Sequence, residues 1–381
     1  MVKKLQHILI TGGAGFIGSN LSLALVKKGY SVTVLDNLSE QIHGENPELD
    51  SQLYLNIKDK VRFVKGDVTN KEDVLKALQN KQAVIHLASE TGTGQSMYEI
   101  ERYNRVNVTG TAVLLDALMN DENNVQKIIL SSSRAVYGEG KYVNSSSEFV
   151  YPNQRLSQQM EQGFFEMTDE EGKILQAFPT DENSKLHPVS FYGLTKLQQE
   201  QMLKLCCETK ALKYVILRYQ NVYGDGQALR NPYTGILSVF SNQILSDKPI
   251  NVFEDGLPSR DFIFIDDVLE ATIRSLELDA ADNEVINVGT GVSTSVLEVA
   301  KVLTNKYKKN VDINVSGHFR IGDIRHNFAD LVKMKKLLNF TPKISFEEGI
   351  DRFTRWVLNQ PIPENYFEKS LEEMKEKGLL K

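Results

Sequence analysis

A tyrosine and a lysine four residues apart, Tyr192 and Lys196 in "YGLTK", are the side chains of this sequence best suited to proton transfer. On a helix, that spacing places both side chains on one face. A nearby ammonium group favours the phenolate, so we expect Lys196 to lower the pKa of Tyr192 from about 10. A tyrosine with a lowered pKa can act as a base near neutral pH.

The same Tyr–Lys spacing occurs at two other places, and the surrounding sequence distinguishes the three pairs. Tyr54 and Lys58 precede the third predicted strand, whereas Tyr137 and Lys141 span a turn that contains two glycines. Only Tyr192 opens a long helical stretch, which continues as "TKLQQEQMLKLCCET". We therefore predict that Tyr192 is the base.

Three glycines, Gly12, Gly15 and Gly18 in "ITGGAGFIG", lie between a predicted strand and a predicted helix. Glycine permits a tight turn there and lets the backbone approach a diphosphate at the helix N-terminus. Asp36 ends the second predicted strand, where a carboxylate can bind the adenosine ribose hydroxyls and repels a 2′-phosphate. The pattern predicts a site for NAD rather than NADP, with a simple tight turn as the alternative. Asp67 is predicted beside the adenine or, alternatively, as a helix N-cap.

Short β-branched runs alternate with helical stretches over the first 220 residues. The predicted strands are residues 7–11, 31–35, 61–65, 83–87, 127–131 and 214–218. This alternation is typical of a parallel sheet covered by helices on both faces. After about residue 220 the alternation loosens and Pro and Gly turns appear, which predicts a smaller lobe. The run "EVINVG", residues 284–289, is expected to return to the sheet.

The composition is that of an ordinary globular protein of 381 residues, with 41% hydrophobic and 25% charged residues. A net charge of −6 argues against a nucleic-acid partner. No apolar window approaches the length of a membrane span, and the N-terminus lacks the pattern of a signal peptide. The two cysteines are adjacent, and the histidines have no suitably spaced partners, so no metal is expected. We expect a cytoplasmic protein without a membrane partner.

The motifs resemble, in order and spacing, those of the extended short-chain dehydrogenase/reductases that act on nucleotide sugars. They are "TGGAGFIG", Asp36, "GDV", "VIHLAS", "VNVTGT", "SSSRAVYG", "YGLTK", "LRYQNVYG" and "SRDFIFIDDV", between residue 7 and about residue 345. The resemblance implies an α/β fold with a Rossmann-type doubly wound parallel sheet and a smaller C-terminal α/β lobe that binds substrate. The expected NAD domain is 1–222, with an insertion at about 140–186. The expected nucleotide-sugar lobe is 223–381, of which about 262–290 returns to the sheet.

The resemblance also implies which residues hold the two ligands. For NAD they are Gly12, Gly15, Phe16, Ile17, Gly18, Asp36, Asn37, Asp67, Val68, Leu87, Ala88, Ser89, Asn107, Ser131, Tyr192, Lys196 and Tyr219. For a nucleoside-diphosphate sugar they are Thr91, Ser133, Arg134, Tyr192, Asn221, Arg260, Arg320 and Asp323. Asn221, Arg260 and Arg320 would contact the diphosphate, for which the planar fork of arginine is suited. A surface salt bridge is the alternative for each arginine, and Asp323 would bind the nucleoside ribose.

The residues after Ser133 distinguish two reactions of the family. Ser133 is implied to hydrogen-bond the sugar oxygen beside Tyr192, and 4,6-dehydratases follow this hydroxyl with an Asp–Glu pair. Arg134 and Ala135 stand here instead, and neither is a suitable general acid. The expected enzyme is an isomerase, a 4-epimerase: Tyr192 takes a proton, a hydride leaves C4 for NAD, and it returns to the opposite face of a keto-sugar. The alternatives are a dehydrogenase or reductase, a 4,6-dehydratase and an inactive dinucleotide-binding scaffold.

Between Ser133 and Tyr192 lie 58 residues, a longer gap than is usual in the extended family. A long insertion is more often functional than idle, so a lid and a surface excursion are both open. The insertion and its flanks resemble the dTDP-L-rhamnose 4-epimerase branch, and a UDP-hexose is the alternative substrate. Members of that branch carry a Cys-x-x-Cys pair in the insertion, whereas "FFEMTDEEGKIL" has no cysteine. The family also implies a homodimer.

Overall fold

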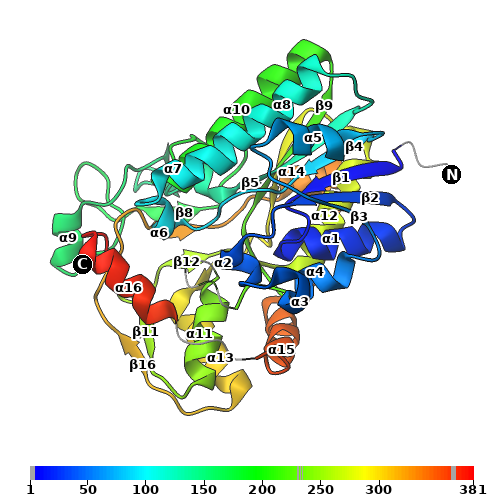
Figure 1. Ribbon diagram of the computed structural model, residues 1–381. Coiled ribbons are helices and arrows are strands. Elements are labelled where there is room, and N and C mark those ends of the chain that lie inside the picture. The colour runs from blue at the N-terminus through cyan, green and yellow to red at the C-terminus, as the bar shows by residue number, and fades with distance from the viewer. Residues whose placement is uncertain (1–4, 230, 232, 234, 362–365) are drawn as a thin grey trace.

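A computed structural model describes residues 5–229, 231, 233, 235–361 and 366–381. At its centre lies a sheet of seven strands in the order β14-β9-β5-β4-β1-β2-β3 (Figure 1). The strands are β1 (His7–Thr11), β2 (Ser31–Asp36), β3 (Arg62–Lys65), β4 (Ala83–His86), β5 (Lys127–Ser133), β9 (Lys213–Tyr219) and β14 (Glu284–Val288). Every neighbouring pair is parallel, and the order reverses between β1 and β4. A reversal of this kind is where open α/β sheets bind their ligands.

Alternate residues of these strands enter two separate cores, one on each face of the sheet. Ile8 and Ile10 of β1 belong to the core under α1 (Phe16–Lys27), α12 (Ile265–Glu277) and α14 (Val332–Leu338). Leu9 belongs to the opposite core, under α5 (Lys71–Leu78), α8 (Gly110–Asn120) and α10 (Phe191–Lys210). Burial on both faces explains why the strands are almost uniformly apolar. The predicted Rossmann-type fold is thereby confirmed.

A third core forms the smaller lobe below the carboxyl ends of the strands (Figure 1). Its elements are β10 (Asn221–Tyr223), α11 (Ile236–Leu245), β11 (Ile250–Val252), β13 (Phe262–Phe264), α13 (Val296–Tyr307), β16 (Ile313–Val315) and α15 (Phe346–Val357). Nearby, β12 (Ser259–Arg260) pairs with β15 (Thr294–Ser295) and β17 (His326–Asn327). Of the segment expected to return to the sheet, β14 joins it, whereas β13 pairs with β10. The core of this lobe thus lies opposite the two cores of the sheet, at the carboxyl ends of the strands.

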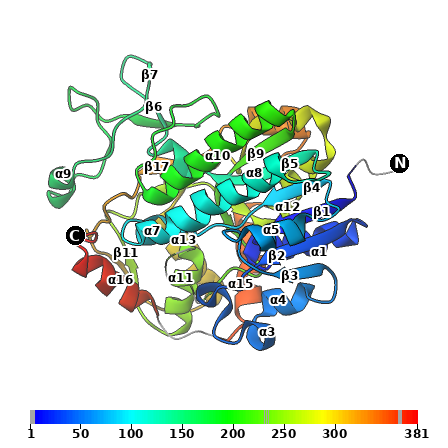
Figure 2. The same ribbon diagram turned by 45° about the horizontal axis from the view of Figure 1, so that its top comes forward.

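The insertion is a separate excursion from the domain (Figure 2). It contains a small antiparallel sheet of β6 (Lys141–Val143), β7 (Phe149–Val150) and β8 (Gln176–Phe178). The helix α9 (Ser157–Glu161) lies between β7 and β8 in the chain. Two ion pairs fasten it to the lobe. The buried Arg155 binds the buried Glu254 carboxylate at 2.7 and 2.9 Å, and the half-buried Glu166 pairs with the buried Arg325. None of its described residues lines the cavity discussed below, so the structure gives no support to a lid.

The remaining elements are short, except for the last helix. They are α2 (Glu40–His43), α3 (Pro47–Asp50), α4 (Gln52–Ile57), α6 (Thr93–Ser96), α7 (Ile100–Tyr103) and α16 (Tyr366–Glu376), with a π-helix at Asn104–Thr109 and 3-10 turns at Arg134–Tyr137 and Asp279–Ala281. In the described part of the chain, no helix is long and apolar enough to cross a membrane.

Candidate active site

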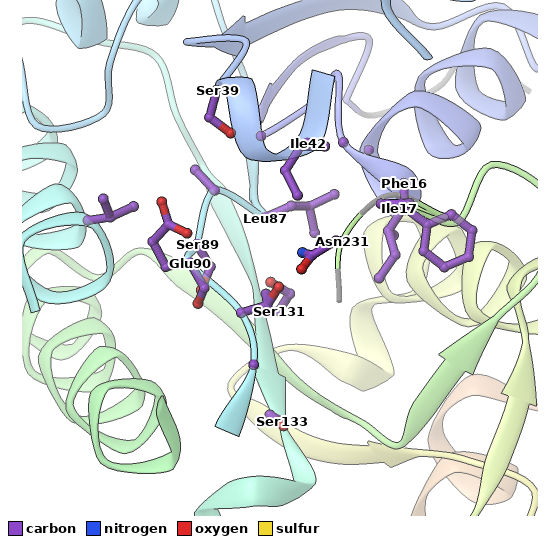
Figure 3. A pocket seen from close by; sticks show the side chains of 18 of the residues that line it. Phe16, Ile17, Ser39, Ile42, Leu87, Ser89, Glu90, Ser131, Ser133 and Asn231 are labelled. Carbon is purple, nitrogen blue, oxygen red and sulfur yellow. The ribbon is translucent and has the colours of Figure 1, made fainter. Parts of the chain in front are cut away.

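A cavity of about 450 Å³ opens at the carboxyl ends of β1, β2, β4, β5 and β9, where the strand order reverses. In Figure 3, Ser131 and Ser133 lie along β5, Ser89 and Glu90 lie beside them, and Ile42 of α2 faces them from across the cavity. Loops that follow different strands therefore build one site, as the parallel topology requires.

The glycines at the start of α1 form a cradle in which a side chain would collide with the backbone or enter the cavity. Gly12 has a φ of +67°, and a Cβ there would lie 2.7 Å from the backbone nitrogen of Ala88. A Cβ on Gly18 would overlap the carbonyl oxygen of Gly12. At Gly15 a Cβ would meet only the Gly12 oxygen, at 3.4 Å, and would otherwise occupy the cavity. This is the open backbone surface that a dinucleotide diphosphate requires at a helix N-terminus, so the residues fit NAD.

Asp36 is held rigidly at the adenosine end of the cavity. Its carboxylate accepts hydrogen bonds from the backbone N–H groups of Ala14 and Leu38, both at 2.9 Å. Burial raises its pKa, while the neighbouring His43 and these N–H groups lower it. Asp67, the other predicted acid, accepts a bond of 3.0 Å from the side-chain amide of Asn37. The two acids therefore lie at one end of the cavity, where they can bind hydroxyl groups and the adenine edge.

The glycines offer a test that separates folding from cofactor binding. We expect Gly15→Ala to keep the thermal stability of the cofactor-free protein but to lose most bound NAD, because its methyl group projects into the cavity. Gly18→Ala should lose both, because its methyl group overlaps backbone, a strain of about 1–3 kcal/mol. NAD released per chain and the thermal midpoint are the measurements. NAD content equal to wild type in the Gly15 variant would contradict the assignment of this loop.

Ser133, Tyr192 and Lys196 all line this cavity. Ser190 caps α10 through a 3.1 Å bond from the Gly193 N–H, which places Tyr192 and Lys196 on the first two turns. Burial raises the pKa of Tyr192, although a hydrogen bond with Ser133 and the charge of Arg134 lower it. The expectation that Lys196 lowers this pKa is therefore wrong for the structure, since burial outweighs the nearby charges.

Lys196 contacts the protein backbone rather than the tyrosine hydroxyl. Its ammonium donates to the Ser131 carbonyl at 2.9 Å and lies 5.9 Å from the centroid of the Tyr192 ring. Burial lowers its pKa to about 7, against the charge of Glu200, which raises it. The lysine can therefore exchange a proton near neutral pH, and the hydrogen bond holds it on the face of α10 that carries Tyr192.

Most predicted cofactor residues line this cavity. They are Gly12, Gly15, Phe16, Ile17, Gly18, Asp36, Asn37, Asp67, Val68, Leu87, Ala88, Ser89, Ser131, Tyr192, Lys196 and Tyr219. Asn107 does not line the cavity but lies between the loop after β4 and α10. Its fully buried amide accepts from the Glu90 N–H at 2.7 Å and donates to the Thr195 hydroxyl at 2.9 Å. Asn107 thus fixes the loop after β4 against α10, a positioning role that motif matching does not separate from ligand contact.

The predicted substrate residues divide into two groups. Thr91, Ser133, Arg134, Tyr192 and Asn221 line the cavity, whereas Arg260, Arg320 and Asp323 do not. Both arginines bind Asp323, whose carboxylate accepts a hydrogen bond from Arg260 at 2.7 Å and one from Arg320 at 3.0 Å. Although burial raises the pKa of Asp323, these arginines hold it well below its usual range. Their contact with a diphosphate stays a prediction.

Arg134 lies between these groups. Its Nε donates to the Asn221 side-chain oxygen at 3.0 Å. Burial and then the charge of Arg260 lower its pKa to about 9, while the carboxylate of Asp323 raises it. Arg134 is thus a cation at neutral pH that faces the cavity beside Ser133.

Sequence reasoning missed two stretches of the lining, besides single residues next to the motifs. The missed residues are Leu35, Ser39, Gln41, Ile42, His43, Gly66, Glu90, Gly92, Thr93, Val106, Ser132, Ala135, Gln220, Val222, Gln227, Ala228, Asn231, Tyr233 and Gly235. The first stretch, 39–43, follows β2, so its place after Asp36 could have indicated it. The second comes from the lobe, and only the folded arrangement brings its described residues to the cofactor loop; they are Gln227, Ala228, Asn231, Tyr233 and Gly235.

Comparison with known proteins identifies the family. The model of the NAD dependent epimerase/dehydratase family matches residues 8–157 and 166–289. The chain belongs to this family. Over 357 residues it is 38% identical to a dTDP-L-rhamnose 4-epimerase of Burkholderia thailandensis, covering 93% of this chain and 96% of that protein.

Solved structures of the family have the same fold. UDP-glucuronic acid 4-epimerase of Bacillus cereus, in complex with UDP-glucuronic acid and NAD, has a TM-score of 0.75 at 28% identity, covering 93% of this chain and 99% of its own. UDP-glucose 4-epimerase of Thermotoga maritima, with UDP-glucose, has a TM-score of 0.73 at 30% identity and the same coverage. These matches confirm the prediction of an NAD-dependent epimerase, which is an isomerase, and the prediction of a nucleotide-sugar ligand.

Proposed function

We propose that this protein is a nucleoside-diphosphate-sugar 4-epimerase and that Tyr192, Ser133 and Lys196 carry the reaction. The observation that carries the proposal is their meeting in the one cavity that also contains the glycine cradle and Asp36. A base at that position can reach a substrate hydroxyl while the cofactor lies along the strand ends.

Arg134 and Ala135 favour epimerisation over dehydration. Loss of water from a sugar needs an acid that protonates the leaving hydroxyl, and Ala135 has no proton to exchange. The guanidinium of Arg134, with a pKa of about 9, stays charged at neutral pH and is a poor acid. Its fixed charge beside Ser133 instead favours a negative oxygen on the sugar.

The residues divide the proton chemistry as follows. When bound, the nicotinamide supplies oxidation and then reduction at C4. The Tyr192 oxygen accepts the proton of the C4 hydroxyl and later returns it. The Ser133 hydroxyl hydrogen-bonds to the same oxygen and steadies the charge that develops there. The Lys196 side chain, held by the Ser131 carbonyl near the Tyr192 ring, has a pKa of about 7 and can exchange a proton near neutral pH.

We propose dTDP-L-rhamnose as the substrate. The support is the 38% identity with a dTDP-L-rhamnose 4-epimerase over nearly the whole of both chains, above that of the relatives named for UDP-sugars.

Proton NMR of the purified protein with dTDP-L-rhamnose, UDP-glucose and UDP-N-acetylglucosamine in separate tubes tests the reaction and the substrate. We expect a C4-inverted anomeric signal with dTDP-L-rhamnose and no stoichiometric formation of NADH. Conversion of a UDP-sugar alone would contradict the substrate, and stoichiometric NADH would indicate a dehydrogenase. No conversion in any tube after addition of NAD would contradict both the reaction and the substrate.

We also propose a cytoplasmic homodimer that serves polysaccharide biosynthesis. The dimer has structural support: α8 and α10 run side by side on the outside of the NAD domain (Figure 1). Leu194 and Leu205 of α10 are exposed. Two such helices from each copy would form a four-helix contact. Chromatography with light scattering measures the mass of the assembly.

A further inference from the structure

Asn231 carries an unused hydrogen-bond donor into the cavity. Its side chain is 2% exposed, and its Nδ2 has no hydrogen-bond partner among the described residues. The orientation of the amide is fixed, because its Oδ1 accepts the backbone N–H of Tyr233 at 3.0 Å. Figure 3 shows the carboxamide in the middle of the cavity. A buried donor without a partner costs free energy unless a ligand supplies the acceptor.

Residues 225–229, the described part of the loop that precedes Asn231, pack onto the beginning of α1. The Asn20 side chain donates to the Asp225 carbonyl at 3.0 Å. Phe16, in the first turn of α1, shares the lobe core with Leu229. Asn231 therefore approaches from the lobe the helix N-terminus that the glycine cradle opens. Diphosphate oxygens only accept hydrogen bonds, so they match a lone N–H donor at this place.

A clasp holds this loop over the cavity. The Glu373 carboxylate of α16 accepts from the Tyr233 hydroxyl at 2.7 Å and from the Tyr98 hydroxyl at 3.2 Å. Tyr233 lines the cavity in the lobe, whereas Tyr98 follows α6 of the NAD domain. One carboxylate thus joins the two sides of the site and limits the positions that Asn231 can take.

From these contacts we propose that Asn231 is a ligand-binding residue whose Nδ2 donates to a diphosphate oxygen in the cavity. Two diphosphates have this chemistry, that of NAD and that of the nucleotide sugar. The second rests on the proposed function, and the first rests only on the NAD site. Glu373 acts through Tyr233 as a positioning residue for the same contact.

The variant Asn231→Asp tests the donor with little other change. It keeps the oxygen that accepts the Tyr233 N–H, replaces the donor with an oxygen and adds a charge that repels phosphate. We expect roughly tenfold weaker binding or more for the diphosphate concerned. NAD content per chain reports on the cofactor, and calorimetric titration with dTDP reports on the nucleotide. Asn231→Ala, which adds no charge, should show a smaller loss in the same measurement and serves if the Asp variant does not fold.

Asn242→Asp is the matched control. Asn242 supports the same loop from α11, since its Nδ2 donates to the Leu229 carbonyl at 2.7 Å, but it does not line the cavity. We expect it to leave both affinities within about twofold of wild type. Equal losses in this control would mean that loop loosening, and not the donor, causes the effect and would overturn the proposal.

The two binding measurements, of NAD and of dTDP, identify the ligand. Loss of NAD alone assigns the contact to the cofactor, loss of dTDP affinity alone assigns it to the substrate, and unchanged binding of both overturns it. Neither measurement requires turnover. A wild-type protein that binds NAD and dTDP but converts no sugar would contradict the proposed function and leave this result standing.

Discussion

Replacing Tyr192 by phenylalanine will lower kcat by about 10²–10⁴-fold while NAD content and substrate affinity stay close to those of wild type. The change removes one oxygen atom from a ring that lines the cavity, and the ring itself still packs edge-on against Tyr103, with 6.5 Å between the ring centroids. The loss should therefore appear in the chemical step, because only the proton acceptor is gone.

Three further variants make the Tyr192 result specific. Tyr54→Phe removes the same atom from another tyrosine that precedes a lysine by four residues, and its ring packs on Phe63 outside the cavity. It should turn over like wild type. Ser133→Thr keeps the hydroxyl and should retain more activity than Ser133→Ala. A Tyr192→Phe enzyme with nearly full kcat would show that another group moves the proton.

The strands were predictable because their sequence signal is local. β1 has the predicted bounds, residues 7–11, and the remaining strands of the sheet differ by at most two residues at an end. Buried parallel strands must be apolar along their whole length, so short β-branched runs mark them clearly. Chain order and the right-handed crossover rule then restrict the sheet to few topologies.

The position of the catalytic pair on α10 was also predictable from the sequence, but its electrostatics were not. Helical spacing places Tyr192 and Lys196 on one face, whereas the pKa of each depends on burial by elements far away in the chain. Proximity suggested that the ammonium would lower the tyrosine pKa, yet desolvation acts on both groups and raises one pKa while lowering the other.

Residues supplied by the lobe were the hardest to predict. Asn231 lies in no recognised motif, and its place at the cavity depends on the lobe core that Leu229 and Phe16 share and on the clasp at Glu373. Arg260 and Asp323 were placed by motif, but in the structure they pair with each other at 2.7 Å. Such contacts join segments that are distant in sequence, and no local pattern encodes them.

Lys196→Met will abolish most activity and yet make the cofactor-free protein more stable at pH 7. The folded pKa of Lys196, about 7, lies below its ordinary value of 10.5 because burial disfavours the charge. Keeping this lysine therefore costs on the order of 4 kcal/mol at pH 7. Methionine removes the cost and loses the hydrogen bond to the Ser131 carbonyl, which leaves a gain of roughly 2 kcal/mol in the free energy of unfolding.

The expected pH dependence separates this charge effect from a packing effect, because a packing effect would be the same at every pH. Between pH 7 and 10.5 the unfolded chain binds more protons than the folded one, so wild-type stability from this group rises with pH. The advantage of Lys196→Met should thus be largest below pH 7 and shrink as the pH rises toward 10.5. Thermal midpoints of both proteins across this range, after removal of the cofactor, measure the difference.

Lys127→Met is the control for burial of a lysine as such. Lys127 is also buried, but its ammonium pairs with Asp282 at 2.7 Å, so methionine there leaves a carboxylate without its nearest cation. It should destabilise the protein, since a broken buried pair costs several kcal/mol. Opposite signs for the two substitutions would show that Lys196 is kept for its chemistry at the expense of the fold. A destabilised Lys196→Met protein at every pH would instead show that the lysine is part of the packing.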